Sequence, residues 1–156
     1  MASTSANARV DRFFDDLVRS ETRLYNAVGE ALRAEHGIVT SQFEMLRFVR
    51  DHSDCRVAEI AMYFAAGVGA ISKGCDRLEA RGWLMRTPNP ADGRSSLIRL
   101  TDDGAGLVAD AERTFRKQLA ALITPVLDPE QLDAVAAAVA ALRSALQDQG
   151  LGTPAG

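Results

Sequence analysis

The sequence has few of the features that mark membrane, secreted or disulfide-stabilised proteins. No apolar run among its 156 residues approaches the roughly 18 that a membrane-spanning helix needs. Two cysteines, Cys55 and Cys75, are too few for a disulfide framework and are typical of a reducing compartment. The N-terminus has neither a basic stretch nor the apolar core of a secretory signal. We therefore expect a cytoplasmic protein without a membrane partner.

Catalytic and cofactor motifs are equally scarce. The two histidines lie far from any nucleophile signature, and no carboxylate pair stands in a recognisable catalytic motif. Residues 51–55 (DHSDC) gather possible metal ligands, but one short turn rarely supplies a full coordination shell. We expect no enzyme activity, no cofactor and no metal.

One glycine-rich segment, residues 67–73 (GVGAISK), could be a loop that cradles a phosphate or the bare start of a helix. A phosphate-binding loop needs a strand before it and a longer helix after it. Residues 58–64 (AEIAMYF) have helical periodicity instead, and neither complete phosphate-loop motif is present. We therefore interpret the segment as a helix start that keeps its backbone exposed.

Charge is distributed unevenly along the chain. The formal net charge is −3, which by itself argues against a polyanionic partner. Between Val68 and Arg99, however, six basic residues accompany three acidic ones, so this segment carries +3 and the remainder −6. Exposed charges act over a Debye length of about 10 Å, so a local basic segment can contact phosphates in spite of an acidic body.

Helical periodicity dominates the N-terminal half. Apolar spacing predicts one long amphipathic helix from Val10 to about residue 34, ended at Gly37 by a left-handed C-cap. Ser41 and Glu44 have the spacing of a capping box at the start of a second helix. Two short helices around a break at residues 65–67 then predict a helix-turn-helix unit.

The second helix of this unit has two distinct faces. Ile71, Cys75 and Leu78 form its inner face, so Cys75 is expected to be a small core residue. Cys55 is expected in a turn and more exposed. The outer face of the helix offers polar, charged or absent side chains at Gly69, Ser72, Lys73, Asp76 and Arg77.

A β-hairpin and two further helices complete the chain. An Asp-Gly pair in residues 88–94 (PNPADGR) predicts a long, basic hairpin tip. Thr101 is expected to cap a helix that runs to about Ile123, and Asp128 to cap the last helix. That last helix carries a 3-4 spaced apolar seam suited to a partner helix: Leu132, Val135, Val139, Leu142 and Leu146.

Residues 76–104 (DRLEARGWLMRTPNPADGRSSLIRLTDDG) strongly resemble the MarR family of winged helix-turn-helix transcriptional regulators. The most specific parts are Asp92-Gly93-Arg94 and Leu100-Thr101-x-x-Gly104. The resemblance implies a mainly α fold with a small β-hairpin wing and N- and C-terminal dimerisation helices. The expected organisation is a flexible N-terminus (1–9), a dimerisation helix (10–36), a DNA-binding lobe (37–100), two C-terminal dimerisation helices (101–148) and a flexible tail (149–156).

The resemblance also implies a function. Such a protein would bind double-stranded DNA as a homodimer, repress a palindromic operator and respond to a small aromatic or phenolic effector. Arg94 would enter the minor groove, Asp92 would hold the wing loop, and Arg86 and Asn89 would touch phosphates. On the recognition helix the family's polar positions correspond to Gly69, Ala70, Ser72 and Lys73, with Arg77 on the same face.

The recognition helix departs from the family pattern. Family members often carry Asp-Arg-Ser-Thr where this chain has residues 67–70 (GVGA), and small apolar residues cannot make bidentate hydrogen bonds to base edges. We expect Ser72 and Lys73 to make most base contacts, and DNA shape to supply more of the discrimination. The alternative is a winged helix that docks proteins and no longer reads DNA sequence.

An effector site is harder to place from sequence. The resemblance implies a site between the dimerisation helices and the DNA-binding lobe, where Arg47 could pair an effector carboxylate or simply be exposed. Four aromatic residues are expected in the core: Tyr25, Phe43, Phe48 and Phe115.

Overall fold

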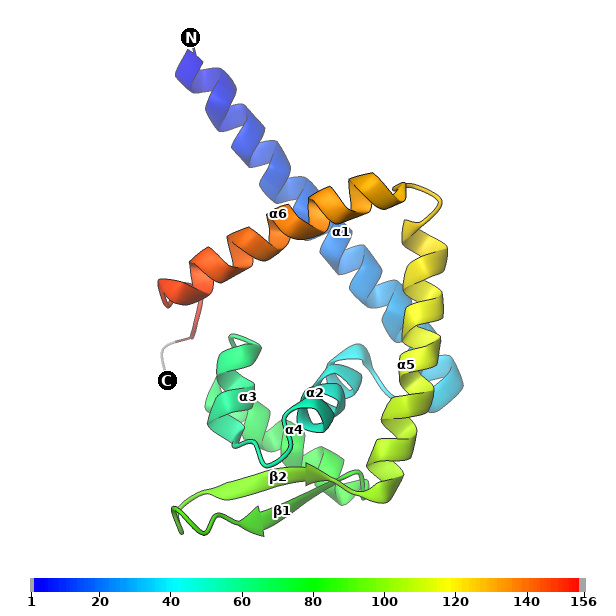
Figure 1. Ribbon diagram of the computed structural model, residues 1–156, viewed down its shortest axis with the longest axis vertical. Coiled ribbons are helices and arrows are strands. Elements are labelled where there is room, and N and C mark those ends of the chain that lie inside the picture. Colours follow the sequence, from blue (N-terminus) through cyan, green and yellow to red (C-terminus); the bar gives the residue numbers. More distant parts are fainter. Residues whose placement is uncertain (1, 155–156) are drawn as a thin grey trace.

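The computed structural model describes residues 2–154, with side chains from residue 7 onward. Six helices and one hairpin follow in the order α1 (Ala2–His36), α2 (Thr40–Asp51), α3 (Val57–Tyr63), α4 (Val68–Ala80), β1 (Leu84–Pro88), β2 (Ser96–Leu100), α5 (Asp102–Ile123) and α6 (Pro129–Asp148) (Figure 1). The expected mainly α fold with a small hairpin is confirmed. Among these described helices, none is long and apolar enough to cross a membrane.

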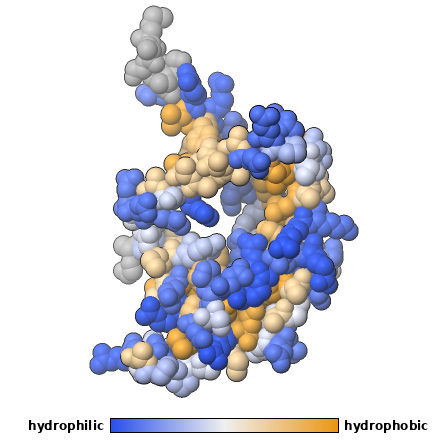
Figure 2. Space-filling view, in the orientation of Figure 1, coloured by the Kyte–Doolittle hydropathy of each residue, from blue (hydrophilic) through white to orange (hydrophobic). Residues whose placement is uncertain are grey.

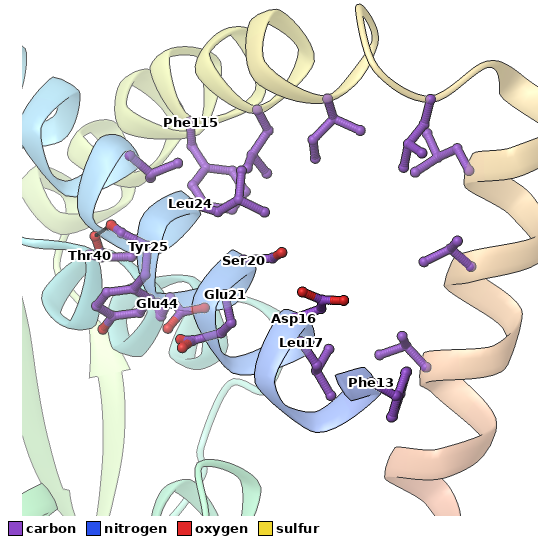
Figure 3. A pocket seen from close by; sticks show the side chains of 17 residues that line it. Phe13, Asp16, Leu17, Ser20, Glu21, Leu24, Tyr25, Thr40, Glu44 and Phe115 are labelled. Carbon is purple, nitrogen blue, oxygen red and sulfur yellow. Dashed lines mark hydrogen bonds between the residues drawn. The ribbon is translucent and has the colours of Figure 1, made fainter. Parts of the chain in front are cut away.

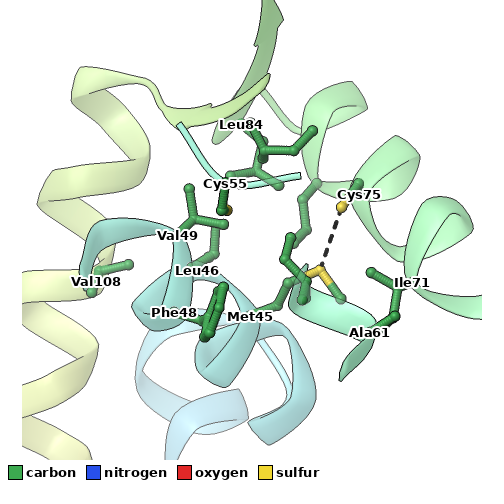
Figure 4. Close-up of a cluster of buried hydrophobic side chains, with 13 residues drawn as sticks. Met45, Leu46, Phe48, Val49, Cys55, Ala61, Ile71, Cys75, Leu84 and Val108 are labelled. Atoms are coloured by element: carbon green, nitrogen blue, oxygen red, sulfur yellow. Dashed lines mark hydrogen bonds between the residues drawn. The ribbon is translucent and has the colours of Figure 1, made fainter. Parts of the chain in front are cut away.

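The first core lies in a compact lobe made by α2, α3, α4 and the hairpin. Leu46, Ile60, Leu78 and Ile98 are fully or almost fully buried there, one from each of these elements (Figure 4). Each helix contributes the inner stripe that its 3-4 spacing predicts, and the hairpin contributes the inward side of its pleat. The lobe therefore folds around its own side chains.

The hairpin pairs with one further residue, Cys55, which the sequence does not predict. β1 and β2 run antiparallel from Leu84 opposite Leu100 to Pro88 opposite Ser96. The Ile98 amide also donates to the Cys55 carbonyl at 2.8 Å, which adds residue 55 to the far edge of β2. Cys55 is consequently only 5% exposed, and the expectation of an exposed thiol in a turn was wrong.

A second core joins the lobe to the long helices. Val28 and Leu32 of α1 pack with Phe43 of α2 and Ala111 of α5. Trp83 packs against both cores, and the start of α5 passes close to it. A Cβ on Gly104 would lie 2.0 Å from the Trp83 carbonyl oxygen, so only glycine fits this crossing.

Two helix starts differ from the expected ones. α1 is already helical at Ala2, which corrects the expected start at Val10; the flexibility expected of residues 1–9 stays a prediction, and Met1 lies outside the described residues. The N-cap residue of α2 is Val39, two residues before the Ser41 of the predicted capping box with Glu44. The Gln42 side-chain carbonyl instead accepts from the Val39 amide at 3.0 Å, which satisfies an otherwise free donor at the helix start.

The other predicted boundaries are confirmed. Gly37 and Gly82 take positive φ values of 67° and 76° just after α1 and α4. Thr101 accepts from the Gly104 amide, and Asp128 accepts from the Gln131 amide, so each side chain caps its helix. Of the tail 149–156, the last two residues lie outside the described part of the chain.

Helix α6 contrasts with the lobe because none of its residues is buried. Its apolar seam is largely open: Val135 is 49%, Leu142 39% and Leu146 43% exposed. Across from it, the N-terminal half of α1 leaves Phe13 and Phe14 49% and 66% exposed. The space-filling view shows apolar α6 bordering an open hollow above the lobe (Figure 2).

Candidate nucleic-acid interface

Helix α4 is fixed on one side and open on the other. Ile71, Cys75 and Leu78 are 7%, 1% and 1% exposed in the lobe core, as their spacing predicts. The opposite face is exposed at the predicted positions Gly69, Ala70, Lys73 and Arg77, and half-exposed at Ser72. The helix thus presents one outward face whose direction is set by the packing of the other.

The turn before α4 is tight for an unexpected reason. Ala65, and not Gly67, takes the left-handed conformation, with φ of 48°, and the Ala66 amide returns to the Ala61 carbonyl at 2.9 Å. A residue with a Cβ rarely adopts this conformation, so the turn is held by the bonds around it. Gly67 has an ordinary φ of −67° as the N-cap residue.

Packing does not require the glycines at the start of α4. A Cβ added to Gly67 or Gly69 would meet nothing within 4 Å. Both positions face open space, so almost any side chain would fit there. The first turn of α4 leaves its backbone accessible to whatever lies against this face.

The wing loop is held by its own polar side chains. Asn89 donates to the Ser95 hydroxyl at 2.9 Å and accepts from the Ala91 amide at 3.0 Å. Asp92 accepts from the Arg94 amide at 3.0 Å, so it holds the loop in the way the resemblance implies. Asn89 is engaged inside the loop, whereas the side chain of Arg94 extends from an exposed position at the tip.

Arg86 ties the wing to the recognition helix. Its guanidinium contacts the Asp76 carboxylate at 2.6 Å and the Glu79 carboxylate at 3.3 Å, and it donates to the Ser72 carbonyl at 3.4 Å. Its pKa is raised because these bonds and charges outweigh a burial that acts the other way. To make the predicted phosphate contact, Arg86 would have to break its bonds to Asp76, Glu79 and Ser72, which join β1 to α4.

The remaining cations divide into engaged and free ones. The Arg81 guanidinium lies 4.2 Å from the centroid of the Trp83 ring, and Arg99 is paired with Asp54. Among the residues that the structure describes, Lys73, Arg77 and Arg94 form no ion pair. Because Arg86 occupies Asp76 and Glu79, these three free cations dominate the charge of the outward face.

The two thiols lie in the core and are unsuited to oxidant sensing. Burial raises the pKa of Cys55 to about 11 and also raises the pKa of Cys75. Reactive thiols need the thiolate form and access to solvent. No group of three or more candidate metal ligands comes together among the side chains that the structure describes.

Comparison with known proteins agrees with this geometry. Residues 38–96, which contain the lobe and most of the wing, match the model of the MarR family. The multiple antibiotic resistance protein MarR of Salmonella typhimurium is 36% identical over 70 residues, which are 45% of this chain and 49% of that protein. The transcriptional repressor NicR of Pseudomonas putida is 28% identical over 106 residues, covering 68% of this chain and 66% of NicR.

The fold comparison extends further along the chain. Sco3205 of Streptomyces coelicolor, a MarR family regulator solved in complex with DNA, superposes with a TM-score of 0.84 at 21% identity, covering 94% of this chain and 93% of that one. The family match covers residues 38–96, so this part of the chain is a MarR-type domain. The sequence match spans about half the length of the Salmonella MarR relative, and the MarR fold spans nearly the whole chain.

The structure has a cavity in the region where the resemblance implies an effector site, although no pattern in the sequence identified its lining. This cavity, of about 790 Å³, opens between α1, α2, α5 and α6 (Figure 3). Tyr25, expected in the core, is 38% exposed and lines it together with Thr40 and Glu44. Arg47 does not line it; its guanidinium lies 4.8 Å from the Phe115 ring centroid and 3.8 Å from the Glu44 carboxylate.

Proposed function

We propose that the protein is a DNA-binding transcriptional regulator that acts as a homodimer, and that it represses a palindromic operator. The observation that carries the proposal is the outward face of α4 and the wing, where Lys73, Arg77 and Arg94 are free for phosphates while neighbouring acids are paired with Arg86. Relatives named MarR and NicR, and the DNA complex of Sco3205, support the same function.

In this proposal α4 enters the major groove and the wing tip carries Arg94 toward the adjacent minor groove. Ser72 and Lys73 supply hydrogen bonds to base edges, and the Ala70 methyl can contact a thymine methyl. Gly69 contributes no side chain, so its exposed backbone can approach the DNA closely. Part of the discrimination then comes from DNA shape.

The dimer follows from the helices that the single chain leaves bare. The seam of α6 and the N-terminal half of α1 expose apolar side chains that a second copy would cover: Phe13, Phe14, Val135, Leu142 and Leu146. A two-fold dimer would place two α4 helices on half-sites about one helical turn apart. Such a regulator acts on the chromosome, so the proposal includes a cytoplasmic location. It also includes the absence of catalysis, because a regulator of this kind only binds DNA.

A small effector would act by shifting populations. A ligand that binds between the long helices and the lobe favours dimers whose α4 helices are spaced unsuitably for adjacent grooves. Its differential affinity for the two arrangements sets how far the equilibrium moves.

The deciding experiment is selection of binding sites from a random duplex pool with the purified protein at moderate salt. A recovered palindrome with half-sites about one turn apart is expected. Recovery of no motif by a folded dimer would contradict DNA reading and favour the second candidate, a protein-docking winged helix. That candidate is favoured by one observation, the exposed apolar group of Met62, Tyr63 and Val68 around the turn.

A further inference from the structure

The cavity between the long helices has an unusual charge. Its walls are largely apolar, formed by residues such as Leu24, Phe115 and Leu119. The described residues that line it include three carboxylates, Asp16, Glu21 and Glu44, and no basic side chain. Figure 3 shows Glu21 and Glu44 gathered with Tyr25 and Thr40 at the end near α2, while Asp16 lies toward Phe13 and α6.

Charge compensation at this inner end is incomplete. Arg47 approaches Glu44 to 3.8 Å, but it stands behind Phe43 and Phe115 and outside the lining. The pKa of Glu44 is nevertheless raised, chiefly because the carboxyl is buried. The charge of Arg47 acts in the opposite direction, and the negative charge of Glu21 raises the pKa further. Arg47 pairs with Glu44, and no ion pair of Glu21 is found among the described residues, so an aromatic acid would add a further negative charge to this end of the cavity.

We propose that the inner end of this cavity binds a hydrophobic cation, for which Glu21 and Glu44 supply the charge and the apolar walls the contact area. The proposal deepens the effector part of the proposed function and rests on it. The whole cavity measures about 790 Å³, within the usual range for small-ligand sites, and the inner end is part of that space. Aromatic faces of Tyr25 and Phe115 add cation–π attraction. An aromatic effector with a carboxylate, of the kind that Arg47 could pair, would have the wrong sign for this lining.

The site lies on the joint between α1 and the lobe. The Thr40 hydroxyl donates to the Tyr25 carbonyl at 3.1 Å, and a Cβ on Gly29 would lie 2.8 Å from the same hydroxyl oxygen. The two helices therefore meet in direct contact at the floor of the cavity. A ligand wedged against Tyr25 and Glu44 would press on the joint that sets the lobe against the dimerisation helices.

The outer end of the cavity has a different occupant. Phe13, Val135 and Val139 line it beside the bare seam of α6, where the second copy is expected. The cation site is thus confined to the end where carboxylates, and not only apolar groups, face the space.

The test uses two ions of equal shape and opposite charge, tetraphenylphosphonium and tetraphenylborate, with the full-length protein in sodium buffer. Calorimetry should show saturable binding of the phosphonium and at least about tenfold weaker binding of the borate. Equal or tighter binding of the borate would overturn the proposal. So would absence of binding by either ion, since the partner copy would then fill the whole cavity.

Charge-neutral variants locate the site. Glu21→Gln and Glu44→Gln should each weaken phosphonium binding by about tenfold or more. Glu30→Gln, which removes an exposed α1 carboxylate outside the lining, is the matched control and should bind as the parent does. If Glu44→Gln fails to fold, Glu21→Gln decides alone. Unchanged affinity in a folded Glu21→Gln protein contradicts the site. DNA binding by the ligand-free protein is measured separately, so the two proposals can fail independently.

Discussion

Helices α4 and α6 both present an outward face, but they differ in how firmly contacts within the chain hold them in place. α4 buries Ile71, Cys75 and Leu78 in the lobe, so its outward face points in a direction determined within one chain. α6 buries no residue, and its outward face is apolar instead of charged. A charged face on a helix held in place suits a polar partner that binds reversibly. An apolar face on an unsupported helix needs a permanent one.

The largest expected effect comes from breaking the α6 side of this contrast. Leu142→Glu places a charge in the seam of both copies of the dimer, where it would be buried without a partner. We expect the dimer dissociation constant to rise at least about a hundredfold, by light scattering or sedimentation. Ser144→Glu, two residues along the same helix and off the seam, is the control. A stable dimer of Leu142→Glu would disprove the seam.

The next effect concerns the charged face alone. Arg94→Ala should weaken duplex binding by about tenfold or more without changing assembly, because it removes a free cation at the wing tip. A dimer carries two such residues, so the slope of log affinity against log salt should fall by about 1.8. Arg113→Ala, on an exposed part of α5, should leave both quantities unchanged. An unaltered slope for Arg94→Ala would contradict its place against the DNA.

Arg86 links the wing to α4 through its ion pairs with Asp76 and Glu79. Arg86→Gln should cost a few tenths of a kcal/mol to about 1 kcal/mol of stability, since partly exposed ion pairs are screened by solvent. DNA affinity should fall severalfold while the salt slope stays constant, because wing and α4 lose their link but no phosphate contact is removed. A slope reduced by about 1.8, measured by titration at four or more salt concentrations, would favour the phosphate contact that the resemblance implies.

Local signals in the sequence predicted most of this fold. The Asp-Gly pair placed the hairpin, Thr101 and Asp128 placed two helix starts, and 3-4 spacing separated the two faces of α4. Each of these signals acts within a few residues, so no tertiary information is needed.

The predictions that failed depend on residues distant in sequence or on the absence of a pattern. Cys55 is buried by a bond to Ile98, 43 positions away. The ion pairs of Arg86 with Asp76 and Glu79 join two elements and have no local signal in the sequence; its phosphate contact stays a prediction. The first turns of α1 carry no apolar stripe to mark them, and the cavity exists only because α1, α2, α5 and α6 converge.

The smallest expected effect tests why α4 begins with so little side chain. Gly69→Ala should stabilise the protein by about 0.4–1 kcal/mol, because the added methyl meets no atom within 4 Å and alanine favours a helix. The same methyl should weaken DNA binding severalfold if the backbone of α4 lies against the duplex. Gly106→Ala on α5 is a matched control, since its Cβ also meets open space; it should stabilise the fold and leave DNA affinity alone. Thermal melting and DNA titration together decide the point. A Gly69→Ala protein that is both more stable and unimpaired in binding would show that the bare helix start serves no contact with DNA.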